Sequence, residues 1–215
     1  MTSYELRENE GFINLPLIAI LRGVKPTEVL AIAEVLIANG FRFIEVPLNS
    51  PDALISIKVL VEHYGDLAII GAGTVTDTDK LMHVLETGAK LIVTPNMNPD
   101  VIRLASQKGC TVMSGVQTPT EAFCAIQNGV SALKMFPAEV IGTAGLKAVK
   151  SVLPPEMVCL PVGGIQPDSE QMKEYIKAGA EGFGLGSGLY YPGITPEDLN
   201  QRCIEYKNAW KNSNI

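Results

Sequence analysis

One lysine of this chain lies inside an apolar segment, where an ammonium group would lose most of its hydration. Lys134 belongs to SALKMFPAEV, residues 131–140, and is flanked by Leu133 and Met135. Loss of hydration lowers the pKa of a lysine, so more free amine is present near neutral pH. A free amine can attack a ketone to form a Schiff base, an electron sink for breaking a neighbouring carbon–carbon bond. The alternative is a lysine whose stem follows a strand end and carries its charge to solvent.

A glutamate in a second apolar segment offers the proton transfer that such chemistry requires. Glu45 lies in FIEVPL, residues 43–48, and strand alternation would place it on the same face as Phe43. A carboxylate beside the lysine can move protons through the carbinolamine, imine and enamine stages. An ion pair between Glu45 and a neighbouring arginine or lysine is the alternative.

Two glycine-rich segments late in the chain could bind a phosphate. PVGG (161–164) and GLGSG (184–188) each follow a predicted strand, and backbone N–H groups in such loops of a barrel often cradle phosphate. The alternative is that the glycines only permit tight turns. The candidate phosphate-binding residues are Gly163, Gly164, Gly186 and Ser187.

Two further polar residues lie at predicted strand ends. Arg22, in ILRG, could clamp an anion or form a surface salt bridge, and Thr74, in GAGTV, could touch a carboxylate or carbonyl group.

Composition excludes several other classes of function. The 215 residues are 47% hydrophobic with a formal net charge of −6, which argues against nucleic-acid binding. No apolar run is long enough to span a membrane, and the N-terminus does not resemble a signal peptide. Two histidines and four cysteines without a CxxC pair leave little from which to build a metal centre. We therefore expect a cytoplasmic protein that uses no metal or other cofactor.

Short apolar runs alternate with helical patterns along the whole chain. Eight runs suit strands that are buried in a parallel sheet, and they are residues 15–21, 42–48, 67–75, 90–95, 110–116, 132–137, 157–164 and 182–188. Eight such units predict one (β/α)8 barrel over residues 1–215, with 1–14 as an N-terminal helix or extension. An open doubly wound sheet is the structural alternative, but no dinucleotide fingerprint follows the first strand.

Proline and small polar residues indicate where several helices begin. Asn98, Thr118 and Thr195 each precede a proline, the pattern of an N-cap followed by a first helical residue. By the same pattern we expect Ser50 to cap a helix that begins at Pro51.

Taken together, these motifs resemble the 2-keto-3-deoxy-6-phosphogluconate and 6-phosphogalactonate aldolase family. The resemblance covers nearly the whole chain and rests on LPLIAILRG, GFRFIEVPLNSP, IGAGTV, LIVTPN, ALKMFPA, PVGGI and GLGSGLY, in that order. It implies a trimeric (β/α)8 barrel that cleaves a phosphorylated keto-deoxy sugar acid to pyruvate and glyceraldehyde 3-phosphate without a metal.

The resemblance also assigns roles to particular residues. It implies that Lys134 forms the Schiff base and that Glu45 is the general acid and base. Thr74 is expected near the pyruvate carboxylate, Pro95 and Phe136 in the pyruvate pocket, and Arg22 at an anionic end of the substrate. The four glycine-loop residues are expected to bind the phosphate.

Two departures from the gluconate type favour the galactonate branch. Gluconate-type members usually carry EVTLR where this chain has EVPLN, so Asn49 replaces an arginine, and Val162 stands where they tend to have threonine. One or two residues can shift preference between C4 epimers. A sugar-phosphate isomerase or epimerase on the same barrel, and a non-catalytic phosphosugar-binding protein, are the alternative functions.

Overall fold

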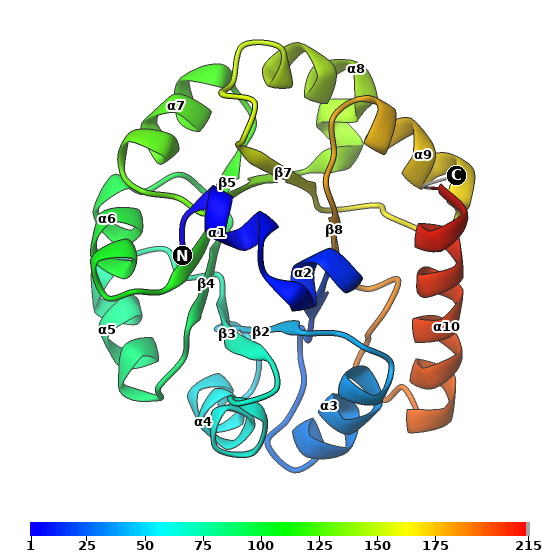
Figure 1. Cartoon of the computed structure of the whole chain (residues 1–215). Coiled ribbons are helices and arrows are strands. Elements are labelled where there is room, and N and C mark those ends of the chain that lie inside the picture. The colour runs from blue at the N-terminus through cyan, green and yellow to red at the C-terminus, as the bar shows by residue number, and fades with distance from the viewer. Residues whose placement is uncertain (214–215) are drawn as a thin grey trace.

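A computed structural model describes residues 1–213, and it folds them into an eight-stranded parallel barrel surrounded by helices (Figure 1). The strands are β1 (Leu17–Ile20), β2 (Phe43–Pro47), β3 (Ile69–Gly73), β4 (Leu91–Thr94), β5 (Thr111–Val116), β6 (Ala132–Met135), β7 (Val158–Pro161) and β8 (Phe183–Leu185). Each strand pairs with its neighbours in chain order, and β1 also pairs with β8. A single bridge between Val162 and Gly184 joins β7 to β8 and completes the ring. The predicted (β/α)8 barrel is therefore confirmed, and the open sheet is excluded.

Helices follow the strands and form the outer ring of Figure 1. They are α3 (Val29–Ala38), α4 (Ala53–Tyr64), α5 (Thr78–Glu86), α6 (Pro99–Gln107), α7 (Pro119–Gln127), α8 (Ala138–Lys150), α9 (Ser169–Lys177) and α10 (Pro196–Ser213). None of the helices within residues 1–213 is long and apolar enough to cross a membrane.

The predicted start of one helix is wrong. Helix α4 begins at Ala53 rather than Pro51, and its N-cap is Asp52, which adopts a left-handed conformation and makes no side-chain cap bond. Ser50 instead accepts a hydrogen bond from the backbone N–H of Gly23 at 2.8 Å. The hydroxyl is thus used in a contact between loops that are distant in sequence, which a local capping pattern cannot reveal.

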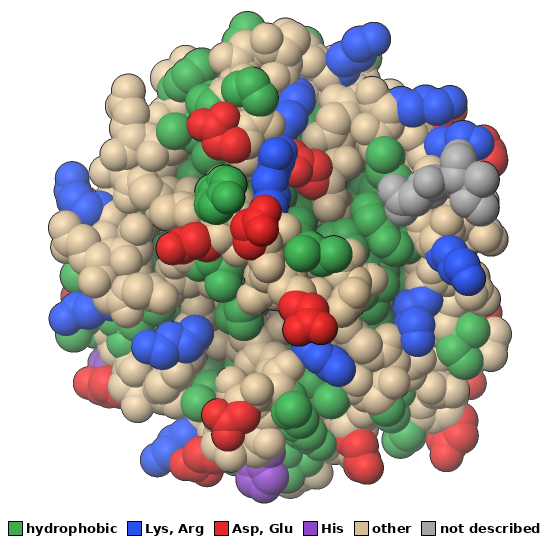
Figure 2. Space-filling model, in the orientation of Figure 1, with side chains coloured by type: hydrophobic (Ala, Val, Ile, Leu, Met, Phe, Trp, Pro, Cys, Tyr) green, Lys and Arg blue, Asp and Glu red, His purple; other side chains and the backbone are tan. Residues whose placement is uncertain are grey.

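Residues 1–14 cover the N-terminal end of the barrel. They form α1 (Ser3–Arg7) and α2 (Glu10–Asn14), which lie across the middle of the ring in Figure 1. Leu6 and Phe12 pack into the barrel interior, and the Phe12 ring meets that of Phe43 edge to face with centroids 5.9 Å apart. Charged side chains of both signs are interspersed over this face (Figure 2). These two helices close one end of the barrel, so the interior opens at the other.

Strand alternation divides the core into two layers. Side chains that point outward, such as Ile44 and Leu133, pack against the helices. Side chains that point inward, such as Phe43 and Ala132, fill the lower part of the barrel. Because successive residues of a strand face opposite ways, the residue two positions after each inward side chain also points inward, toward the C-terminal end.

Candidate active site

Lys134 lies two residues after Ala132 in β6, and Glu45 lies two residues after Phe43 in β2, so both side chains point into the barrel. Both line one small chamber of about 10 Å³ inside the barrel. The other residues around it are Ile18, Ile20, Val93, Met113, Leu160, Val162 and Gly184. Lys134 is 7% exposed and Glu45 is 1% exposed. The structure therefore brings together the two predicted residues, from strands far apart in sequence, in an apolar enclosure.

Burial shifts the pKa of both groups toward neutrality. Desolvation raises the pKa of Glu45 to about 7, although the positive charges of Lys134 and Arg22 act in the opposite direction. Desolvation also lowers the pKa of Lys134, which the charge of Glu45 partly offsets. Among residues 1–213, no ion pair joins these two side chains, and Glu45 Oε2 has no hydrogen-bond partner. Burial therefore favours the neutral amine of Lys134 and the protonated form of Glu45.

The carboxylate of Glu45 lies against the backbone of Gly73, a residue without a side chain on the next strand. A Cβ added at Gly73 would lie 2.0 Å from Glu45 Oε2, so any side chain there would displace the carboxylate. The following residue, Thr74, has a φ of 60°, a left-handed conformation that threonine rarely adopts. The end of β3 is therefore shaped around Glu45.

A larger cavity of about 730 Å³ is lined mainly by residues that follow the C-terminal ends of strands, so it lies at the end of the barrel opposite α1 and α2. Lys134 is at its floor, because it lines this cavity as well as the chamber below. The predicted residues around it are Arg22, Phe136, Val162, Gly163, Gly164, Gly186 and Ser187. Lys134 and residues of both glycine loops thus line one cavity.

The glycine loops present free hydrogen-bond donors. Within residues 1–213, the backbone N–H groups of Gly164 and Ser187 donate no hydrogen bond to the chain. Gly163 and Gly164 have φ values of 109° and 67°, which glycine adopts without strain. The side chain of Gln171 holds this loop, because its Nε2 donates to the Gly164 carbonyl at 3.0 Å. Donors of this kind suit an anion such as a phosphate.

Besides Glu45, which lines only the chamber below, three predicted residues do not line the cavity. Asn49 is exposed beside it and accepts a hydrogen bond from Arg22 Nη1 at 2.7 Å, so it acts on the cavity only through Arg22. Thr74 and Pro95 directly follow the neighbouring strands β3 and β4 but do not line the cavity. Pro95 lies against Gly115, where an added Cβ would be 2.3 Å from the Pro95 carbonyl carbon.

Sequence reasoning missed several residues that do line the cavity. They are Glu139, Gln166, Tyr190, Tyr191 and Pro192. The two tyrosines follow GLGSGL directly, so their place in the same loop was the available signal. Glu139 lies two residues after Pro137, and its side chain passes over Gly164, where an added Cβ would be 2.4 Å from its Cγ.

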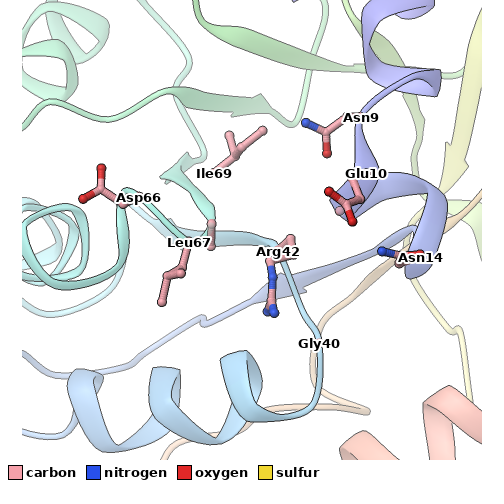
Figure 3. Close-up of a pocket in the computed structure, with 11 residues that line it drawn as sticks. Asn9, Glu10, Asn14, Gly40, Arg42, Asp66, Leu67 and Ile69 are labelled. Atoms are coloured by element: carbon pink, nitrogen blue, oxygen red, sulfur yellow. The ribbon is translucent and has the colours of Figure 1, made fainter.

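A separate hollow of about 500 Å³ lies at the N-terminal end (Figure 3). Glu10 and Asn14 of α2 face it, together with Arg42, Asp66 and Leu67. Arg42 donates from Nη1 to the carbonyls of Ile37 and Phe41. None of the predicted site residues lies there. In the part of the chain that the structure describes, no three His, Cys, Asp or Glu side chains gather in a group that could hold a metal ion.

Comparisons with known proteins agree with this arrangement. The family model for KDPG and KHG aldolase matches residues 9–202. A probable 2-dehydro-3-deoxy-6-phosphogalactonate aldolase of Rhizobium meliloti is 46% identical over 88% of each chain. The 2-dehydro-3-deoxy-6-phosphogalactonate aldolase of Escherichia coli K12 is 45% identical over 92% of this chain and 95% of that protein.

Solved structures show the same relationship. A structure described as native KDPGal superposes with a TM-score of 0.90 at 44% identity, covering 93% of this chain and 96% of the other. A KDPG aldolase from Legionella pneumophila, with pyruvate captured as a covalent carbinolamine, gives 0.77 at 28% identity over 93% and 95%.

The fold and the site thus define a barrel aldolase, and the chain belongs to the KDPG and KHG aldolase family. It is an aldehyde-lyase that cleaves a keto-deoxy phosphosugar acid to pyruvate and glyceraldehyde 3-phosphate. This result excludes the isomerase and the non-catalytic binding protein as its primary function.

Proposed function

We propose that the reaction proceeds through a Schiff base on Lys134, with Glu45 as the general acid and base. The observation that carries this proposal is that both side chains line one buried chamber beneath an open cavity. The depressed pKa of Lys134 supplies the neutral amine, and the raised pKa of Glu45 suits a group that both accepts and returns protons.

Each step then has a group to perform it. The Lys134 amine adds to the C2 ketone, and the carbinolamine loses water to give a protonated imine. The C4 hydroxyl gives its proton to Glu45 while the C3–C4 bond breaks. The electron pair of that bond passes toward the imine nitrogen, and an enamine forms. Glyceraldehyde 3-phosphate leaves, C3 of the enamine takes a proton, and water releases pyruvate from Lys134.

The remaining residues would hold the two ends of the substrate. Gly163, Gly164, Gly186 and Ser187 would form the phosphate-binding loops, with the free N–H groups of Gly164 and Ser187 as donors, and Phe136 would pack against pyruvate. Thr74 and Pro95 would reach pyruvate only from the strand ends beside the cavity. Arg22, on the cavity wall, would bind an anionic end of the substrate.

The 6-phosphogalactonate epimer is the substrate that we favour. Val162 lines both the chamber and the cavity, so its side chain can contact a substrate that is bound at Lys134. Asn49, which bonds Arg22, is the second residue that departs from the gluconate pattern. Two relatives above 40% identity carry the galactonate name.

We also propose a cytoplasmic homotrimer; the four free cysteines suit a reducing compartment.

Two experiments test this function. Incubation with pyruvate and borohydride should add the mass of a reduced pyruvate adduct to a peptide that contains Lys134, and an intact protein without that adduct would exclude the Schiff base. Values of kcat/KM measured side by side on both C4 epimers should favour the galactonate form. A preference for the gluconate form would reverse the assignment of substrate while leaving the lysine chemistry in place. Size-exclusion chromatography with light scattering tests the trimer.

A further inference from the structure

One face of α10 holds both glycine loops from outside the cavity. Arg202 donates a hydrogen bond from Nη1 to the carbonyl of Gly188, in the loop after β8. The Tyr206 hydroxyl donates to the carbonyl of Ile165, in the loop after β7, at 2.8 Å. Residues four apart on a helix lie on the same face. Neither side chain lines the cavity, so α10 connects the two loops on the side that faces away from the cavity.

The loop after β8 lies directly on this helix face. A Cβ added at Gly188 would be 2.1 Å from the Tyr206 hydroxyl oxygen, so only glycine allows this approach. The guanidinium carbon of Arg202 is 5.4 Å from the centroid of the Tyr191 ring, a cation–π distance, and Tyr191 lines the cavity. Arg202 therefore contacts both ends of the segment from Gly188 to Tyr191.

Few positively charged side chains line the cavity near the glycine loops, where we expect the phosphate. The cationic side chains that line it are Arg22 and Lys134, and Lys134 is placed for the chemistry at the floor. Glu139 brings a negative charge close to Gly164. The guanidinium of Arg202 remains charged at every physiological pH, and it is bonded to the peptide that follows Ser187 and Gly188.

We propose that Arg202 is a positioning residue for the phosphate: it fixes the Gly186–Gly188 backbone and places a permanent positive charge behind it. This inference rests on the proposed function, because it assumes that the glycine loops bind the phosphate of the substrate. A group that acts only on phosphate binding alters KM for phosphorylated ligands and leaves the lysine chemistry unchanged.

The test is run in the direction of synthesis, with pyruvate and either D-glyceraldehyde 3-phosphate or D-glyceraldehyde as acceptor. These two aldehydes differ only by the phosphate. Arg202→Met should raise KM for the phosphorylated acceptor about tenfold, equivalent to about 1.4 kcal/mol. It should change kcat by less than about twofold and leave the kinetics with D-glyceraldehyde unchanged. Inhibition by inorganic phosphate should weaken in parallel, and Arg202→Lys should restore part of the loss.

Arg103→Met is the matched control, because Arg103 is an exposed arginine of α6 that pairs with Asp100 in its own helix. It removes the same charge and should change neither KM. An equal rise in KM for both acceptors with Arg202→Met, or no rise for either, would overturn the proposal. If Arg202→Met does not fold, Arg202→Gln takes its place, and the same ratio of KM for the phosphorylated acceptor to KM for D-glyceraldehyde is measured.

Failure of the proposed function is seen separately. It appears in the unmodified protein, as a lack of the pyruvate adduct on Lys134, whereas failure of this inference appears only in the ratio of the two KM values.

Discussion

The ammonium nitrogen of Lys134 lies 4.9 Å from the centroid of the Phe136 ring. The two residues are two positions apart at the end of β6, so both side chains turn toward the interior and then the cavity. The ring face stabilises the charged form of the lysine, but burial favours the neutral amine and dominates the shift in pKa. Phe136 therefore encloses the amine without holding it permanently protonated.

Lys134→Met should abolish turnover while leaving the protein folded. The variant has no amine for imine formation, so we expect kcat to fall by at least about 10⁴-fold. Methionine is similar in length and carries no charge into the barrel, so the melting temperature should equal or exceed that of the parent. Steady-state kinetics and thermal unfolding measure the two effects; substantial residual activity would exclude Lys134 as the nucleophile.

Glu45→Gln should slow the reaction by about 10²–10⁴-fold, because the amide cannot exchange a proton with the substrate. In the parent enzyme, the carboxylate that accepts the C4 proton forms as the pH rises through about 7. The rate of cleavage should therefore rise with pH across that range, and Glu45→Gln should lack this limb of the profile. A rate of cleavage in the parent that is flat between pH 6 and 8 would contradict the role.

The same carboxyl group should make folding stability depend on pH. Its pKa is about 7 in the folded protein, whereas an ordinary solvated glutamate has a pKa of 4.5. Between these values the folded protein therefore binds more protons at Glu45 than the unfolded chain does. The stability contributed by the protonated acid is lost as the pH rises from 4.5 to 7. Denaturant unfolding of the parent and Glu45→Gln across this window should show a difference in stability that grows with pH in favour of the variant.

Gly73→Ala should impair catalysis more than folding. The added methyl would occupy the place of the Glu45 carboxylate, whose side chain can move. Gly71→Ala is the contrasting variant, because its methyl would lie 1.7 Å from the backbone carbonyl oxygen of Leu91 and force the strands apart. We expect Gly73→Ala to fold with reduced kcat and Gly71→Ala to be destabilised by more than about 3 kcal/mol. Equal melting temperatures for the two would contradict this reasoning.

Ser187→Ala should mainly raise KM. If the hydroxyl donates to the phosphate equally in the ground and transition states, its loss weakens binding by roughly tenfold without slowing the chemical step. Kinetics with the phosphorylated substrate measure the effect. A fall in kcat at unchanged KM would instead place Ser187 near the reacting atoms.

Local pattern predicted the face of Glu45, because strand alternation depends only on the residue count within a strand and places Glu45 with Phe43. For Lys134 the local segment left two alternatives, an inward amine and a lysine whose charge reaches solvent, and the frame of eight repeated units with the family resemblance favoured the first. The barrel itself follows from eight repeated units, because parallel strands require helical crossovers. Capping at Asn98 and Thr118 was also predicted, since an N-cap bond spans only three residues.

Contacts between segments that are distant in sequence were decided only by the tertiary structure. Three features depend on how the barrel closes and how α10 lies against it. They are the N-cap at Asp52, the absence of Thr74 and Pro95 from the cavity lining, and the hydrogen bond from Arg202 to the Gly188 carbonyl. Closure is set by strand registers, such as Glu45 beside Ile20 and Lys134 beside Leu160. These registers arise from packing of the whole core, which no single segment of the sequence encodes. The sequence by itself therefore determined the chemistry available to this protein, and the closed barrel determined which residues meet to perform it.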